Sequence, residues 1–350
     1  ADEVSILAGV RHGVTTGAPV AIRIGNSEWP KWETVMSADP VDPSALLIDA
    51  GTGDEREIAR NRPLTRPRPG HADLPGMLSY DLSEARPVLE RASARETAAR
   101  VALGTLAEAL LEQVADVRLV SHVIAVGTQR ARSEVVPMPA DENALCEASM
   151  RALDPADNAR FEAAVDEAKH AGDTIGGVVE VIAYGVPVGL GTHVTARERL
   201  DARLAAALMS IQSVKGVEIG DGFAQAALLG SAAHDEIVRG ADGHLTRTTN
   251  HAGGIEGGTS NGAPIVARAA FKPISTVPRA LRSVDLATGE EAVGLHQRSD
   301  TCQVVPGAVI AEAEVALVLA DALFDHAGGR SVAEMRRNLS SYLEVVGERA

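Results

Sequence analysis

Short runs of β-branched and aliphatic residues alternate along this chain with longer stretches of helical periodicity. Runs bounded by glycine predict strands, and apolar residues at helical spacing predict helices. The predicted strands are Glu3–Val10, Val20–Ile24, Val117–Val126, Gly177–Tyr184, Val217–Ile219 and Ile265–Phe271. The predicted helices cover residues 93–114, 197–216, 308–329 and 331–346, and residues 40–75 and 129–158 look irregular. No linker interrupts the pattern, so we expect a single α/β domain over residues 1–350.

Local signals set the expected ends of these helices. Ser93 and Ser331 each precede a glutamate by three residues, which is the capping-box spacing. The helix over 197–216 is expected to end at Gly216. Its buried face is expected to carry Leu200, Leu204, Leu208 and Ile211.

Two segments of the chain resemble each other. Residues 13–23 read GVTTGAPVAIR and residues 258–268 read GTSNGAPIVAR. Both look like a glycine-bearing turn that leads into a strand, which suggests an internal pseudo-repeat. Coincidence in a chain rich in alanine and glycine is the alternative.

The composition of the chain argues against some classes of partner. The 350 residues carry a net charge of −15, which argues against nucleic acid and anionic membranes as partners. Apolar residues make up 45% and aromatic residues 3%, so aliphatic side chains must build the core. Two cysteines without zinc-type spacing fit a reducing cytoplasm.

A cluster of cationic residues stands out against this acidic background. The stretch RNRPLTRPRPGHAD (60–73) collects Arg60, Arg62, Arg66, Arg68 and His71 between stiffening prolines. Guanidinium groups suit phosphate and carboxylate oxygens, and a histidine here could transfer protons near neutral pH. A solvated loop is the alternative.

A second candidate lies at the start of the helix over 93–114. Arg91 and Arg95 flank Ser93 at a helix N-terminus, which attracts anions. Ser93 could instead be only a helix cap. The two arginines fit the positive end of a helix better if an anion lies between them.

A third candidate, FKPISTV (271–277), follows the strand after the glycine-rich stretch HAGGIEGGTSNGAP (251–264). Lys272, Ser275 and Thr276 offer a cation and two hydroxyls to a phosphate. A Walker site is not supported, because there is no GxxxxGK[ST] motif. A Rossmann fingerprint does not fit either, because a strand rather than a helix follows the glycines.

The fourth candidate is the pair Arg298 and Asp300 in HQRSDTC (296–302), which share a face if this segment is extended. The arginine could bind an anionic substrate while the carboxylate takes a proton. A surface ion pair is the alternative. Together the four candidates suggest a pocket for a small polyanion beside a phosphorylated cofactor.

Several of these segments resemble the chorismate synthase family, in family order and over most of the chain. They are RPGHAD (68–73), RASARETAARVA (91–102), KGVEIGDGF (215–223), GGIEGGTSNGAPIVARAAFKPIST (253–276) and RSD (298–300). The stretch NSEWPKWETVMSADPVDP (26–43) looks like the actinobacterial branch.

The resemblance implies a 1,4-anti elimination of phosphate from 5-enolpyruvylshikimate 3-phosphate to give chorismate. Reduced FMN would be the cofactor, donating electron density transiently with no net redox change. The implied fold is a β-α-β sandwich, and the implied assembly is a homotetramer. The family also links the chain with the shikimate pathway, aromatic amino-acid biosynthesis, NADP and the cytoplasm. No nicotinamide motif is evident, so we expect an external flavin reductase.

The resemblance also implies roles for individual residues. His71 would manage the proton at flavin N1, and Asp300 would assist flavin N5 in removing the C6 proton. The implied substrate-binding residues are Arg68, Ser93, Arg95 and Arg298. The implied FMN-binding residues are Arg91, Ala92, Ser93, Gln212, Ser213, Gly257, Lys272, Pro273, Ile274, Ser275, Thr276 and Arg298.

The chain departs from the family pattern at its start. The family begins with a segment that carries a Gly-Glu-Ser-His-Gly motif, whose histidine protonates the departing phosphate, and two substrate-facing arginines. This segment does not precede Glu3–Val10 here. We therefore expect an N-terminally truncated sequence, and the alternative is a catalytically impaired flavin-binding or assembly subunit of the same fold. A phosphosugar-binding regulator, which would need no flavin, is a third hypothesis.

Overall fold

The computed structural model describes residues 3–42, 61–241, 243–295 and 299–349. The chain divides into a first unit, residues 1–99 with 280–297, and a second unit, residues 100–279 with 298–350. The expected single domain therefore stays a prediction, and each unit is described by itself.

The second unit is built on an antiparallel sheet with the strand order β6-β5-β7-β13-β8. Its strands are β5 (Arg118–Val126), β6 (Gln129–Arg130), β7 (Gly177–Tyr184), β8 (Val214–Ile219) and β13 (Ile265–Phe271). Its shorter strands are β9 (Ile237–Arg239), β10 (Leu245–Arg247), β11 (Ile255–Glu256) and β12 (Thr259–Ser260). β7 and β13 match the predicted strands residue for residue, and burial alternates strictly along β13 as expected for a strand with one face in the core.

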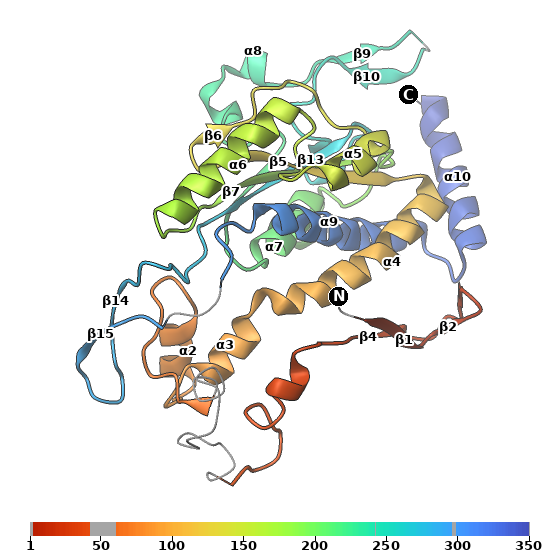
Figure 1. Cartoon of the computed structure of the whole chain (residues 1–350). Coiled ribbons are helices and arrows are strands. Elements are labelled where there is room, and N and C mark those ends of the chain that lie inside the picture. Colours follow the sequence, from red (N-terminus) through yellow and green to blue (C-terminus); the bar gives the residue numbers. More distant parts are fainter. Residues whose placement is uncertain (1–2, 43–60, 242, 296–298, 350) are drawn as a thin grey trace. The chain divides into compact units, whose positions relative to one another are not determined.

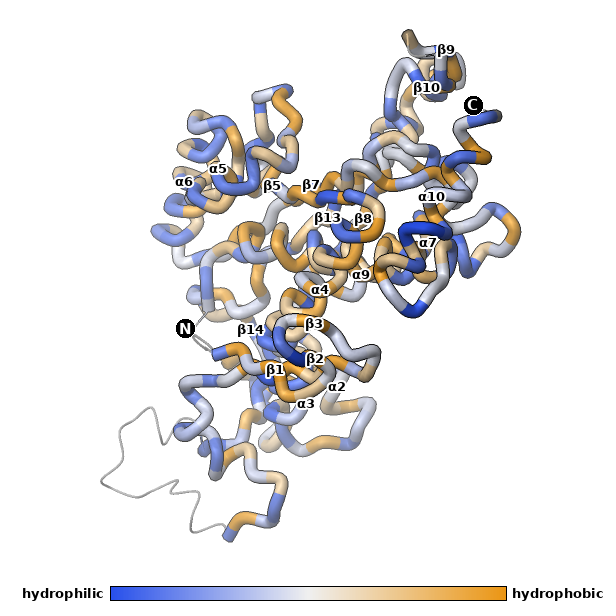
Figure 2. The backbone as a smooth tube through the Cα atoms, turned by 90° about the vertical axis from the view of Figure 1, so that its right-hand side faces the viewer, coloured by the Kyte–Doolittle hydropathy of each residue, from blue (hydrophilic) through white to orange (hydrophobic). Residues whose placement is uncertain are grey.

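Helices pack against both faces of this sheet. The helices of the second unit are α4 (Thr97–Ala115), α5 (Glu142–Glu147), α6 (Pro155–His170), α7 (Leu200–Met209), α8 (Gly230–Ala233), α9 (Val304–Ala327) and α10 (Val332–Arg349). α9 packs on β5 and β7, and α7 packs on β8 (Figure 1). The tube is hydrophobic along β5 and β7 (Figure 2). On the other face, Leu145 of α5 packs against Val120 and Ile182.

Small residues let these elements approach closely. A Cβ atom at Gly104 of α4 would lie 2.4 Å from the Cβ of Ala313 in α9, so this crossing requires glycine. A Cβ atom at Gly307 would lie 2.8 Å from the ring of Phe271. Side-chain volume is therefore limited where α9 meets α4 and β13. Within the described residues, none of the helices is both long and apolar enough to cross a membrane.

The helix ends bear out most of the capping signals. The Ser93 hydroxyl accepts from the backbone N–H of Arg95, one residue before the glutamate, and caps a 3-10 turn (Ala94–Glu96) that leads into α4. The Ser331 hydroxyl accepts from the N–H of Glu334, as the box predicts. The predicted end at Gly216 is wrong: α7 ends at Met209, and Gly216 lies inside β8. Residues 210–213 make the turn, and the β-branched residues after them pair with β13.

The first unit holds smaller elements. Its strands are β1 (Val4–Ala8), β2 (Val10–Arg11), β3 (Val14–Thr15), β4 (Ala21–Ile24), β14 (Arg282–Val284) and β15 (Glu291–Val293). Its helices are α2 (Asp73–Ser79) and α3 (Arg86–Ala92). Leu64, Met77 and Ala85 form a small core at α2 and α3, and of the three only Leu64 lies within residues 40–75, which looked irregular in the sequence.

The internal pseudo-repeat is present in three dimensions. β2 and β3 form a hairpin through His12 and Gly13, and β11 and β12 form one through Gly257 and Gly258, all four with positive φ. Such two-residue turns match the twist of the paired strands. The N–H of Thr16 donates to the Gly9 carbonyl at 2.9 Å, and the N–H of Asn261 donates to the Gly254 carbonyl at the same distance. Each hairpin then leads through Gly-Ala-Pro into a strand, β4 or β13.

A group of carboxylates on the helices of the second unit gives a pH-dependent stability. The pKa of Glu108 in α4 is raised to about 7, because burial, and then the charges of Glu312 and Glu142, disfavour its ionised form. In the unfolded chain this group titrates near 4.3. Its ionisation therefore costs nothing below about pH 4, costs progressively more as the pH rises, and reaches its full cost above about pH 7.

We expect Glu108→Gln to stabilise the protein at pH 8 by about 1–2 kcal/mol, a value discounted for partial exposure, and to change little at pH 5. Urea unfolding at both pH values measures this difference. Glu112→Gln on the same helix is the control, because Glu112 is exposed and ion-paired with Arg118. An equal effect of Glu108→Gln at pH 5 and pH 8 would contradict the assignment.

Candidate functional site

The segment Arg68–Asp73 forms a tight turn in the first unit. The N–H of His71 donates to the Arg68 carbonyl at 3.3 Å, Pro69 precedes Gly70, and Gly70 has a φ of 76°. These are the features of a type II turn, which needs glycine at its third position. The turn brings the side chains of Arg68 and His71 together at the start of α2.

A carboxylate holds both of these side chains. Asp73 is fully buried and accepts from Arg68 Nε at 2.8 Å and from the Arg68 backbone N–H at 3.0 Å. Its other oxygen lies 2.5 Å from His71 Nδ1. Burial tends to raise the pKa of Asp73, but hydrogen bonds from His71 and Arg68 outweigh it and hold that pKa well below its usual range. The sequence analysis missed Asp73, although its position two residues after His71 was a usable signal.

Arg68 is itself buried in this ion pair. Its charge is engaged by Asp73, so its expected contact with substrate stays a prediction. The cationic cluster around it is not one surface: Arg62 and Arg66 are exposed, Arg68 is buried, and Arg60 lies outside the described residues.

The residues around Ser93 have partners within the first unit. Ser93 caps the turn before α4, which fits the interpretation that it is only a helix cap. The Arg95 guanidinium donates to the Gly25 carbonyl at 2.9 Å, and Arg91 at the end of α3 lies 3.9 Å from the Glu96 carboxylate with most of its side chain exposed. These contacts explain why two arginines are tolerated near a helix N-terminus. Contacts of Arg91, Ala92, Ser93 and Arg95 with ligands stay predictions.

In the second unit, several predicted FMN-binding residues meet where β13 ends. The N–H of Lys272 donates to the Ser213 carbonyl at 2.9 Å, and Ser213 has a φ of 71°. Lys272 Nζ lies 3.2 Å from the Ser275 hydroxyl. The structure therefore brings together two segments that are distant in sequence: Gln212 and Ser213 in one, and Lys272, Pro273, Ile274, Ser275 and Thr276 in the other.

Electrostatics at this end of β13 favour an anion. Lys272 is partly buried, and burial, together with the charge of Lys215, lowers the pKa of its ammonium group. A phosphate bound here would offset both effects. Thr276 is buried beside these residues.

The segment that carries Asp300 lies at the same end of the sheet. The Thr174 hydroxyl donates to the Ile274 carbonyl at 2.8 Å, and the N–H of Ile175 donates to the Thr301 carbonyl at 2.9 Å. Asp300 precedes Thr301 and is exposed. Arg298 lies outside the described residues, so the face that it was expected to share with Asp300 stays a prediction.

Gly257 lies elsewhere in the second unit. It is at the tip of the β11–β12 hairpin, whose next residue, Gly258, accepts from the N–H of Leu200 at the start of α7. The hairpin lies near the Ile265 end of β13, whereas Lys272 follows Phe271 at the other end of the strand. Seven residues of strand span roughly 20 Å. Within one chain, Gly257 is thus not brought together with the predicted FMN-binding residues at the Lys272 end of β13.

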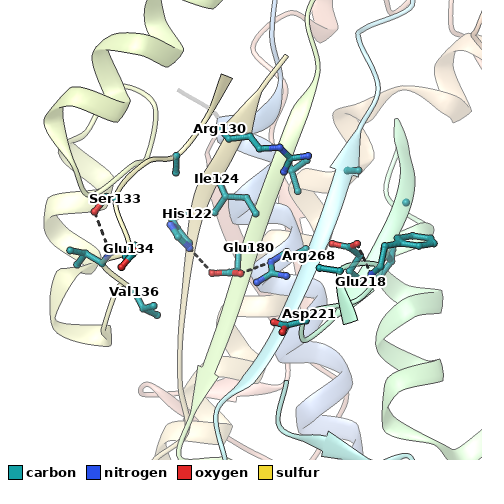
Figure 3. Close-up of a pocket in the computed structure, with 18 residues that line it drawn as sticks. His122, Ile124, Arg130, Ser133, Glu134, Val136, Glu180, Glu218, Asp221 and Arg268 are labelled. Carbon is teal, nitrogen blue, oxygen red and sulfur yellow. Dashed lines mark hydrogen bonds and ion pairs between the residues drawn. The ribbon is translucent and has the colours of Figure 1, made fainter. Parts of the chain in front are cut away.

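A separate cavity of about 770 Å³ lies on the sheet face away from α9, and none of the predicted site residues lines it (Figure 3). On its floor Glu180 lies 2.9 Å from His122 Nε2 and 2.6 Å from Arg268 Nε. Burial alone would raise the pKa of Glu180, but His122 and Arg268 lower it overall. Strand register makes these three residues neighbours, so charged residues on alternating strand positions could have revealed the cluster.

The fold and these groups define a class of protein: an α/β enzyme with a histidine–carboxylate pair in one unit and a partly buried lysine in a turn of the other. Comparisons with known proteins give the family. The model of the family described as chorismate synthase matches residues 1–324. The chain belongs to the chorismate synthase family.

Individual relatives agree. A chorismate synthase of Beutenbergia cavernae is 61% identical over 99% of this chain and 86% of its own length. One of Mycolicibacterium vanbaalenii is 58% identical over 99% of this chain and 84% of its own length. A crystal structure of a chorismate synthase superposes with a TM-score of 0.75 at 33% identity, over 99% of this chain and 85% of that one.

These matches confirm the family, its α/β fold and its activity. The activity is that of a carbon–oxygen lyase, which eliminates phosphate from 5-enolpyruvylshikimate 3-phosphate to form chorismate. No comparison favours the catalytically impaired alternative.

Proposed function

We propose that this enzyme carries out its elimination with reduced FMN, whose phosphate is bound at the end of β13. The carrying observation is the half-buried Lys272 ammonium group beside the Ser275 hydroxyl and near Lys215. A cation and hydroxyls at the start of a turn are a donor set that fits a phosphate. Gln212, Ser213 and the segment from Pro273 to Thr276 would complete the cradle.

The remaining site residues act on the substrate and on protons. His71 would hold the proton at flavin N1, and Asp300 would assist removal of the proton at C6 of the substrate. Ser93, Arg95 and Arg298 would hold the anionic groups of the substrate, while Arg91 and Ala92 would line the flavin. When bound, reduced FMN supplies an electron-rich ring that assists departure of phosphate without net redox change.

The position of Gly257 supports the homotetramer that the resemblance implies. A glycine at a hairpin tip lets backbone approach a ligand closely. Because Gly257 and Lys272 lie at opposite ends of β13, we place Gly257 against the flavin that another copy binds. Each site would then need two chains.

The setting of the reaction is also part of the proposal. An external flavin reductase would supply the reduced cofactor, with NADP entering only through that reduction. Cys146 and Cys302 are both free thiols, which suits the reducing cytoplasm. The net charge of −15 argues against nucleic acid or anionic membrane as a further partner.

Lys272→Met tests the phosphate site. A hydrogen bond to a charged group is worth about 1.5–3 kcal/mol, so we expect FMN to bind about 10- to 100-fold more weakly. Riboflavin, which lacks the phosphate, should bind as it does to the unchanged protein. Anaerobic fluorescence titration with both flavins measures this. Lys31→Met, at an exposed lysine of the first unit, is the matched control. Equal losses of affinity for FMN and riboflavin would contradict the assignment of Lys272 to the phosphate.

A further inference from the structure

His71 is held by two charged neighbours in the described part of the first unit. Asp73 contacts Nδ1 at 2.5 Å, and the terminal nitrogen of Arg68 lies 3.1 Å from Nδ1 and 3.2 Å from Nε2. Asp73 is fully buried, and the His71 side chain is 18% exposed. Of the three side chains, His71 is therefore the one that reaches outward.

The Asp73 carboxylate decides which ring nitrogen carries the hydrogen. Its low pKa keeps it ionised, so it can only accept hydrogen bonds. The close contact with Nδ1 then requires Nδ1–H to donate. In the neutral ring this leaves Nε2 with its lone pair, ready to accept a proton.

Arg68 completes the arrangement without competing for that lone pair. A guanidinium group only donates, and one nitrogen at nearly equal distances from both ring nitrogens lies over the ring rather than along either lone pair. The same guanidinium binds Asp73 through Nε and through its terminal nitrogen. The arginine thus fixes both the carboxylate and the plane of the imidazole.

The surroundings keep the turn rigid. The Ser283 hydroxyl of β14 donates to the Pro67 carbonyl at 2.5 Å. A Cβ atom at Gly294, just after β15, would lie 3.3 Å from the Pro69 ring. The charged groups on these neighbouring segments include Arg66 and Asp285, whose charges interact with each other, and the exposed ion pair of Arg282 with Glu291.

We propose that Asp73 is a positioning residue for the elimination: it locks His71 with Nδ1–H toward its carboxylate and Nε2 toward the reactants. The inference rests on the proton role proposed for His71. Asp73 itself touches neither substrate nor cofactor, and it acts only through His71 and Arg68.

The tautomer can be observed without turnover. In protein labelled with [15N]histidine, long-range 1H–15N correlation spectra should show the Nδ1–H form for His71 near pH 8, assigned by its loss in His71→Gln. Asp73→Asn should abolish that pattern and Asp73→Glu should retain it. Asp157→Asn is the control, because Asp157 is a buried, hydrogen-bonded carboxylate of the second unit. An Nε2–H ring in the unchanged protein, or an unaltered ring in Asp73→Asn, would overturn the proposal.

Kinetic constants distinguish the positioning role of Asp73 from the proton role of His71 on which it rests. Loss of the correct tautomer should lower kcat by about 10²–10⁴-fold in Asp73→Asn. The KM for the anionic substrate should stay equal or fall, because a negative charge has been removed beside Arg68. Asp73→Glu should recover part of kcat. A switched tautomer with unchanged kcat would support the positioning by Asp73 and overturn the proton role of His71. A raised KM with unchanged kcat would overturn the positioning.

Discussion

His71→Ala should lower kcat by about 10²–10⁴-fold and change the KM for 5-enolpyruvylshikimate 3-phosphate by less than about threefold. We expect the imidazole to transfer a proton rather than to bind the substrate. The charged groups beside it, Arg68 and Asp73, are already paired with each other and with His71. Formation of chorismate, followed anaerobically by absorbance with excess reduced FMN, measures both constants.

Two further variants sharpen this result. Asp300→Asn removes the exposed carboxylate beside Thr301 and should give a loss of similar size, because that carboxylate is proposed to assist removal of the C6 proton. His170→Ala, at an exposed histidine in the last turn of α6, should turn over like the unchanged protein. Wild-type turnover in His71→Ala would show that this histidine handles no proton in the reaction.

The regular elements could be predicted from the sequence because local pattern dominates them. β7 and β13 run between glycine-bearing turns with burial that follows their apolar residues. The end of α7 could not be predicted in this way. Gly216 looked like a helix stop, but it lies inside β8, whose pairing with β13 is a tertiary contact.

Candidate site residues could be named from the sequence, and their roles stay predictions, but their contacts could not be predicted. His71 and Arg68 stood out by residue type, whereas Asp73 acquires its role only because a type II turn folds it back onto them. Ser213 and Lys272 are distant in sequence and meet only because β8 pairs with β13. Gly257 and Lys272 are near in sequence yet far apart in space, because a whole strand separates them.

That separation leads to the second large expected effect. In the proposed homotetramer, Gly257→Asn and Lys272→Met should each give an inactive or strongly impaired enzyme, but the two variants mixed within one oligomer should recover activity. If each site takes Lys272 from one chain and Gly257 from another, random assembly of equal amounts restores about a quarter of the sites. If both residues served the same site from one chain, every site would carry a lesion and nothing would recover.

The choice of asparagine keeps the fold intact in this experiment. Gly257 has a φ of 60°, a conformation that asparagine tolerates better than most residues, and an added Cβ would meet only the His193 Cβ, at 3.9 Å.

Gly243→Asn, at an open turn with positive φ, should be fully active alone. Co-expression with two affinity tags, tandem purification and turnover at an FMN concentration that saturates the unchanged protein but not Lys272→Met measure the recovery. No recovery in doubly tagged oligomers would place Gly257 and Lys272 in the same chain's site, and full activity of Gly257→Asn alone would remove it from the flavin. Recovery near one quarter requires that chorismate formation depend on a surface that no single chain supplies.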